Sequence, residues 1–334
     1  MPSFRAIEVH TKSTDFRAAT RIVEVAELPA ATPGNVVVKN HYVGINATDI
    51  NVTNGAYGAR PLPFSCGLEG VGEVVAVGDG VTNFAVGDAI AYQKIGAFAE
   101  YIEVPAATAL KVPAVDPSVL PLLVQGISGS IALEQVGQMK SGETVLVTSA
   151  AGGTGQFVVQ LAKLAGNHVI GTCSSDEKAE VLKALGVDRV INYSKEDMGE
   201  VLKKEYPKGV DLVFETVGGE TFKAAVQNIA VHGRVIVFGY VAGYKDQQAN
   251  FEPYLVSQMN PILLGRSASV RGFILGNHVP QIPEHFARLF KLIAEGKLKP
   301  GVDKTEFKGL EGVADAIDYM YARKNIGKLV IKLV

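Results

Sequence analysis

A glycine-rich stretch, TSAAGGTGQ at residues 148–156, contains the residue types best suited to holding phosphate groups. It follows the short β-branched run TVLV and precedes an amphipathic pattern, so a strand, a loop and a helix are predicted in that order. Ala150 stands where a dinucleotide fingerprint usually has its first glycine. The alternative is a strand–turn–helix unit that binds nothing. The expected pyrophosphate contacts are Ala151, Gly152, Gly153, Thr154 and Gly155.

The residues that follow the next strand, HVIGT, indicate which dinucleotide is bound. NAD enzymes place an acid at the end of this strand, where it bonds the ribose 2′-hydroxyl. Here Ser174 follows the strand, with Lys178 inside the next helix and Tyr193 after the third strand. A hydroxyl, an ammonium and a phenol suit a 2′-phosphate, so NADP(H) is predicted as the cofactor. Lys178 as a solvated surface residue is the alternative.

Two acids, Asp176 and Glu177, lie close to Ser174 and Lys178 in the sequence. We interpret Asp176 and Glu177 as first-turn acids that complement the dipole of a helix, and Ser174 with Glu177 as its capping box. Neither acid is then expected to bind a ribose.

The elements that must position these residues are those of a doubly wound parallel sheet. From about residue 121 to 267, short aliphatic runs alternate with helical patterns, which predicts a Rossmann NADP-binding domain. A long helix is predicted at residues 118–139. Residues 1–120 read as short strands separated by Gly, Asp and Pro turns, and residues 268–334 are too few for a domain of their own. We therefore expect an α/β protein whose β-rich catalytic domain is formed by residues 1–120 and 268–334.

Composition excludes several classes of function. The chain has 334 residues and a formal net charge of −2, which argues against nucleic acid or an anionic membrane as the main partner. No apolar run reaches the roughly 18 residues of a membrane span, and no signal-peptide core is evident. Two cysteines make a disulfide framework improbable, so a cytoplasmic location is expected.

Several motifs resemble those of the medium-chain dehydrogenases/reductases, over essentially the whole chain. They include GINATDINVTNGAYG, GLEGVGEVVAVGDGVTNFAVGDAIA and AAGGTG. The resemblance implies a GroES-like fold for the β-rich domain. Zinc-dependent members carry a cysteine ligand where Asn46 stands and a histidine ligand where Leu68 stands, so no metal is expected here. The motifs ETVGGETF, SASVRGF and YMYARKNIGKLV make the chain similar to the zinc-independent quinone oxidoreductases, and more closely to the prostaglandin reductase 3 group.

The resemblance implies an activity and further site residues. Such enzymes transfer hydride from NADPH to quinones or conjugated enones, and a homodimer is expected through strands near SASVRGF. Asn46 would orient the cofactor or substrate, and Tyr57 would donate to the substrate oxygen; a turn asparagine and a surface tyrosine are the alternatives. The residues implied along the adenine-to-nicotinamide path are Thr216, Phe238 and Tyr244, and those over the nicotinamide are Phe273, Ile274, Leu275 and Asn325.

The substrate expected is a small electrophile: a quinone, an enone or a lipid-derived ketone. A long aromatic loop at residues 240–259 is expected to form part of its wall. One alternative is a 15-oxoprostaglandin or 2-alkenal double-bond reductase with little quinone activity. Another is a non-catalytic NADPH-binding protein, since fold does not determine function.

Overall fold

The computed structural model describes residues 3–58, 60–245 and 256–334, and the chain folds into two compact units. One unit consists of Met1–Val124 and Gly301–Val334, and the other of Gln125–Pro300. The chain thus leaves the first unit, completes the second and returns to the first.

The second unit is built on a six-stranded parallel sheet in the order β11-β10-β9-β12-β13-β14. The strands are β9 (Thr144–Val147), β10 (His168–Cys173), β11 (Arg189–Asn192), β12 (Val210–Glu215), β13 (Ile229–Val237) and β14 (Ser269–Gly272). The order reverses between β9 and β12, and ligands of doubly wound sheets bind at the carboxyl ends of the strands at such a switch point. The predicted Rossmann domain is therefore confirmed.

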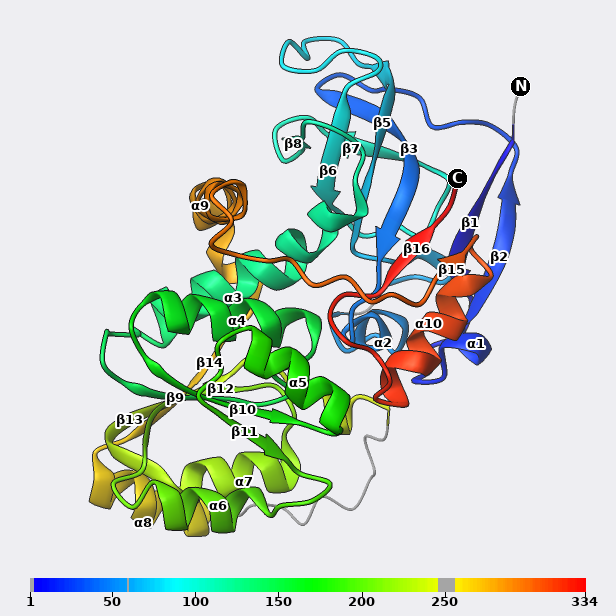
Figure 1. Cartoon of the computed structure of the whole chain (residues 1–334). Coiled ribbons are helices and arrows are strands. Elements are labelled where there is room, and N and C mark those ends of the chain that lie inside the picture. Colours follow the sequence, from blue (N-terminus) through cyan, green and yellow to red (C-terminus); the bar gives the residue numbers. More distant parts are fainter. Residues whose placement is uncertain (1–2, 59, 246–255) are drawn as a thin grey trace. The chain divides into compact units, whose positions relative to one another are not determined.

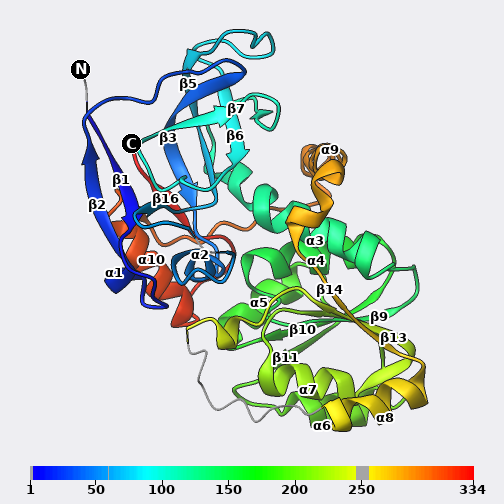
Figure 2. The same ribbon diagram turned by 180° about the vertical axis from the view of Figure 1, so that it is seen from behind.

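Helices cover both faces of this sheet (Figures 1 and 2). One face carries α4 (Gly153–Leu164) and α5 (Asp176–Ala184), and the other carries α6 (Met198–Glu205), α7 (Gly219–Gln227) and α8 (Val256–Arg266). A separate cluster of buried aliphatic residues lies on each face. Burial on both faces explains why the strands read as continuous runs of Val, Ile and Leu.

The helical stretch before β9 differs from its prediction as one helix from 118 to 139. It starts one residue earlier, capped by Asp116, and consists of short 3₁₀, π and α segments. They are η1 (Pro117–Leu122), η2 (Leu123–Ile127), α3 (Ser128–Ile131) and η3 (Ala132–Val136). Pro121 lacks an N–H donor, and this disfavours a regular α-helix through the first segment.

This stretch also qualifies the expectation about membrane spans. Among the described residues, Pro117–Val136 is one helical stretch long and apolar enough to cross a membrane by length and composition. However, 72% of its most apolar window is buried inside the structure, as in the core helix of a soluble protein.

The first unit is β-rich and mostly antiparallel. A three-stranded sheet has the order β2-β1-β4, and a seven-stranded sheet has the order β15-β16-β3-β5-β6-β8, with β7 paired to β3. The strands are β1 (Phe4–Val9), β2 (Thr20–Val25), β3 (Asn35–Gly44), β4 (Phe64–Ser65), β5 (Glu69–Val77), β6 (Ala89–Gln93), β7 (Tyr101–Pro105), β8 (Leu110–Lys111), β15 (Phe307–Lys308) and β16 (Val330–Lys332). The helices are α1 (Phe16–Ala19), α2 (Asp49–Thr53) and α10 (Gly312–Tyr321). The carboxy-terminal β16 pairs with β3, so the returning chain completes this sheet.

The chain returns to the first unit at Gly301, later than the residue 268 expected from the sequence. Strand β14 extends the parallel sheet beside β13, and α9 (Ile282–Ala294) also belongs to the second unit, which ends at Pro300. A four-residue strand with mixed burial gives little sign in the sequence of the sheet that it joins.

Candidate active site

The glycine-rich loop lies between β9 and α4, at the carboxyl end of the sheet. Gly152 is the N-cap of the 12-residue helix and provides no side-chain cap. The first helical bond runs from Gln156 N to Gly152 O at 3.0 Å. The N–H groups of Gly153, Thr154 and Gly155 precede it, so none of them has an acceptor within the helix. The positive partial charge of this helix end fits a pyrophosphate.

Packing explains the glycines of the loop. A Cβ on Gly155 would lie 2.6 Å from the backbone of Ala150 and Ser149, and a Cβ on Gly153 would overlap the side chain of Gln125. A Cβ on Gly152 would lie 3.3 Å from Ser149 O, which is close but not an overlap. The positive φ of the turn, 49°, falls on Ser149, so Ala150 needs no glycine-like conformation.

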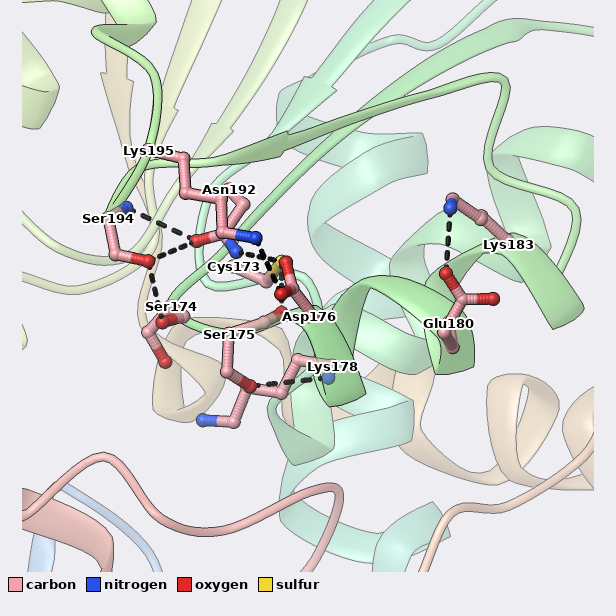
Figure 3. A network of polar contacts seen from close by, with 10 residues as sticks. All are labelled: Cys173, Ser174, Ser175, Asp176, Lys178, Glu180, Lys183, Asn192, Ser194 and Lys195. Carbon is pink, nitrogen blue, oxygen red and sulfur yellow. Dashed lines mark hydrogen bonds and ion pairs between the residues drawn. The ribbon is translucent and has the colours of Figure 1, made fainter.

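Of the residues expected at the 2′-phosphate, Ser174 follows β10 and Lys178 lies inside α5 (Figure 3). The cap of α5 is Ser175, whose Oγ accepts from Lys178 N at 3.3 Å, so the predicted capping role of Ser174 was wrong by one residue. Only 9% of Lys178 is exposed, and its side chain runs back from α5 toward Ser174 and Ser175. Tyr193 directly follows β11, and its N–H donates to Cys173 O at 3.0 Å.

Asp176 has partners that the sequence did not indicate. Its Oδ1 accepts from Asn192 Nδ2 at 3.0 Å and its Oδ2 from Lys195 Nζ at 2.6 Å (Figure 3). The Lys195 ammonium, followed by the Asn192 amide, lowers the pKa of the Asp176 carboxyl. The acid is thus an ion-paired carboxylate in addition to lying in the first turn of α5.

Aromatic residues follow the last strands of the parallel sheet. The rings of Phe238, after β13, and Phe273, after β14, stack at 5.3 Å with 6° between their planes. Tyr244 is buried, and its Oη accepts from Tyr240 N at 3.4 Å. Ile274, the residue after Phe273, is 49% exposed, and Leu275 follows it in the sequence. Of the predicted loop at 240–259, residues 246–255 lie outside the described residues.

Glu215 was not identified from the sequence. It is buried at the end of β12, and burial raises the pKa of its carboxyl. Oε1 accepts from Val217 N at 2.9 Å, and Oε2 accepts from Gly218 N at 3.0 Å. The carboxylate therefore shapes the turn that carries Thr216, whose Oγ1 lies 3.3 Å from Thr148 Oγ1.

In the first unit, Asn46 belongs to a closed polar cluster. Its Nδ2 donates to Glu69 Oε1 at 2.9 Å, and its Oδ1 accepts from Lys328 Nζ at 2.9 Å. Lys328 also donates to Glu69 Oε1, and both side chains are 0% exposed. A single buried lysine distant in the sequence gives no motif, so Lys328 was not identified either.

Asp49 lies beside this cluster. Its Oδ2 accepts from Asn46 N at 2.8 Å, while Oδ1 has no hydrogen-bond partner among the described residues. Burial raises the pKa of this carboxyl to about 7, against the opposing effects of the Asn46 N–H and the Lys328 ammonium. Asp49 is therefore a buried acid that changes charge near neutral pH.

Tyr57 and Asn325 also belong to the first unit. Tyr57 is 45% exposed, and its hydroxyl shares a hydrogen bond with Thr48 Oγ1. Thr48 is two residues from Asn46, so the two predicted catalytic residues share one segment of chain. Asn325 Nδ2 donates to Gly327 O at 3.1 Å, next to Lys328 in the sequence. The other predicted site residues all belong to the second unit.

Known families match both units. Residues 32–114 match the family described as alcohol dehydrogenase GroES-like domain, and residues 153–295 match zinc-binding dehydrogenase. The chain is 47% identical over 329 residues to prostaglandin reductase-3 of Bos taurus, covering 96% of this chain and 87% of that protein. The chain belongs to the medium-chain dehydrogenase/reductase family.

Two further relatives place it within that family. A probable quinone oxidoreductase of Leishmania amazonensis is 44% identical over 336 residues, covering 99% of this chain and 98% of that protein. The Escherichia coli quinone oxidoreductase, solved in complex with NADPH, has a TM-score of 0.85 at 26% identity, covering 98% of this chain and 99% of that one. Within this family, the chain is of the quinone oxidoreductase and prostaglandin reductase-3 type.

The residues of this chain do not fit the zinc that one family description implies. Asn46 and Leu68 stand at the two positions where zinc-dependent members carry ligands, and neither is a cysteine or histidine. The Asn46 amide oxygen is bonded to the Lys328 ammonium, a cation that already balances Glu69. Across residues 3–58, 60–245 and 256–334, no three His, Cys, Asp or Glu residues are grouped as metal ligands.

Proposed function

We propose that the chain is an NADPH-dependent oxidoreductase that transfers hydride to quinones or conjugated enones without a metal ion. The observation that carries the proposal is the uncapped amino terminus of α4 in the same unit as two strand ends followed by a serine and a tyrosine, with a buried lysine in the first turn of α5. The Escherichia coli quinone oxidoreductase with the same fold was solved with NADPH.

The second unit holds the cofactor in this proposal. The N–H groups of Gly153, Thr154 and Gly155 bind the pyrophosphate, with Ala151 and Gly152 allowing close approach. Ser174, Lys178 and Tyr193 bind the adenosine 2′-phosphate. Asn325 is a further cofactor contact in this proposal, and residues farther along the strand ends line the path to the nicotinamide. They are Thr216, Phe238, Tyr244, Phe273, Ile274 and Leu275.

When bound, NADPH supplies the hydride, and the protein supplies orientation and stabilises the negative charge that develops on the substrate oxygen. The half-exposed Tyr57 hydroxyl donates to that oxygen while Thr48 holds it in place. Asn46 presents the remaining hydrogen of its amide nitrogen to the cofactor or substrate, because Glu69 takes the other.

A second candidate function is reduction of 15-oxoprostaglandins or 2-alkenals, with little activity on quinones. The identity of 47% to prostaglandin reductase-3 favours it. A third candidate, NADPH binding without catalysis, rests on the fold alone. NADPH oxidation with ortho-quinones, para-quinones, alkenals and a 15-keto prostaglandin separates the three. Turnover of quinones, alone or together with enones, supports the main proposal. Turnover of the alkenals or the 15-keto prostaglandin with little turnover of any quinone supports the second, and NADPH binding with no turnover supports the third.

We further propose a cytoplasmic homodimer that binds small electrophiles rather than nucleic acid or membranes. Both cysteines, Cys66 and Cys173, are free and buried, as suits a reducing compartment. Strand β14 is the last strand of the parallel sheet, so its outer edge can pair with a second copy. Light scattering tests the dimer: a mass near one chain at micromolar concentration would contradict it.

A further inference from the structure

We propose that Lys328 is a positioning residue for this reaction. Its buried ammonium fixes the Asn46 amide in one orientation and supplies a positive charge in a region where zinc-dependent members of the family bind a metal. The inference rests on the proposed function of Asn46 and goes beyond it, because it assigns the control of that residue to a lysine far away in the sequence.

The ammonium has a full set of acceptors. Lys328 Nζ donates to Ile45 O at 2.9 Å, to Asn46 Oδ1 at 2.9 Å and to Glu69 Oε1. An ammonium has three donors, so its position is determined from three directions. No part of the Lys328 or Glu69 side chain is exposed, so water does not compete for these bonds.

The three side chains form a closed ring that admits one orientation of the amide. Lys328 bridges Asn46 Oδ1 and Glu69 Oε1, and Asn46 Nδ2 donates back to the same carboxylate oxygen at 2.9 Å. Turning the amide over would place its NH₂ against the ammonium and its oxygen against the carboxylate. Val124 N binds the other carboxylate oxygen of Glu69 at 2.9 Å, so the acid is held as well.

The backbone leaves room for this pair. Gly44 ends β3, between β16 and β5, and a Cβ there would overlap Glu69 Oε1 and lie 2.7 Å from Lys328 Cε. Its φ is not in the left-handed region, so the absent side chain, rather than backbone freedom, explains the glycine. The absence of a side chain at Gly44 thus leaves space in the sheet for the ion pair.

The ion pair between Lys328 and Glu69 serves to specify geometry rather than to add stability. Glu69 and Asp49 are two buried acids near one lysine, and Asp49 already binds the Asn46 backbone N–H. Buried ion pairs are costly to desolvate and contribute little net stability, so their use often lies in specifying geometry. Here the geometry specified is that of Asn46, held by its backbone and both ends of its amide.

The test is a double-mutant cycle between Lys328 and Asn46, with Lys332→Met as the matched control on the exposed side of β16. We expect Lys328→Met to lower kcat by about ten-fold or more while the Kd for NADPH changes by less than about two-fold. In an Asn46→Ala background the same substitution should change kcat by less than about two-fold. Equal falls in kcat in both backgrounds would overturn the proposal.

A second variant covers the case in which Lys328→Met does not fold. Gly44→Ala displaces the pair without changing charge, and it should give the same split between kcat and Kd. The Asn46 side-chain amide signal in selectively labelled protein should be protected from exchange in the wild type and lose that protection in either folded variant. Retained protection would overturn the proposal. Because this signal needs no turnover, a wild type that is inactive on every acceptor would refute the proposed function and leave the positioning test standing.

Discussion

Lys195 Nζ lies 2.6 Å from Asp176 Oδ2, and this ion pair places a lysine against an acid that stands two residues after Ser174. Without it, Asp176 would stand as an unbalanced negative charge in the first turn of α5. The pair therefore supports a preference for a phosphorylated ribose, although both partners are exposed.

We expect Lys195→Met to weaken NADPH binding by about two- to five-fold and to leave NADH unchanged, because exposed pairs contribute little and are screened by salt. Asp176→Asn should act in the opposite direction, removing a repulsion. Titration at low and high salt checks both: the differences should shrink as salt rises. An effect of Lys195→Met that is equal for the two cofactors would contradict this role.

Lys178→Ala should weaken NADPH more strongly, because the residue is buried at the helix start. Loss of a charge-assisted contact costs about 1.5–3 kcal/mol, or about 10- to 150-fold in Kd. NADH should bind as before. Lys183→Ala, at the exposed end of the same helix, is the matched control and should alter neither Kd. Equal losses of NADPH and NADH binding would refute the 2′-phosphate assignment.

Substitutions at two glycines of the phosphate loop should affect the free energy of unfolding and the affinity for NADPH differently. Gly155→Ala puts a Cβ 2.6 Å from backbone atoms of Ser149 and Ala150 that have no room to move, so the free energy of unfolding should fall by about 1–3 kcal/mol. The atoms nearest a Cβ at Gly152 are Ser149 O, at 3.3 Å, and Ser149 Oγ, at 3.7 Å, so Gly152→Ala should fold with a Tm near that of the wild type. Its added methyl group should nevertheless hinder the pyrophosphate. Unchanged NADPH affinity in Gly152→Ala would show that the pyrophosphate binds elsewhere.

Asp49 should make stability depend on pH. Its pKa is raised from 3.8 to about 7 in the folded protein, so folding takes up a proton in that interval. The stabilisation is fully present below about pH 4 and is lost as pH rises through 7, at about 1.4 kcal/mol per pH unit. Relative to Asp49→Asn, the wild type should therefore lose on the order of 3–4 kcal/mol between pH 4 and 8. Urea titrations at several pH values measure this, and a constant difference would contradict it.

The sequence was informative where local patterns decide the structure. The TVLV strand, the loop at 148–156 and the helix after it lie as expected, because β-branched runs, glycines and helical periodicity act over a few residues. The strand ends that carry Ser174 and Tyr193 followed from the same alternation.

Features that depend on tertiary contacts could not be predicted in this way. Lys328 meets Asn46 across 282 positions of the chain, and nothing around it distinguishes it from the exposed Lys332. The shift of the cap from Ser174 to Ser175 is within the usual uncertainty of helix ends. The late return to the first unit depends on β14 adding to a sheet edge, which neither its length nor its pattern reveals.

Hydride transfer without a metal is tested by mixing the purified protein with NADPH and each of the quinones and enones and following absorbance at the nicotinamide band, with NADH as the control. We expect oxidation of NADPH by at least one quinone or enone, slower oxidation of NADH, and no change in rate after dialysis against a chelator. Tight NADPH binding with no oxidation by any acceptor, or activity that falls on chelation and returns with zinc, would contradict this expectation.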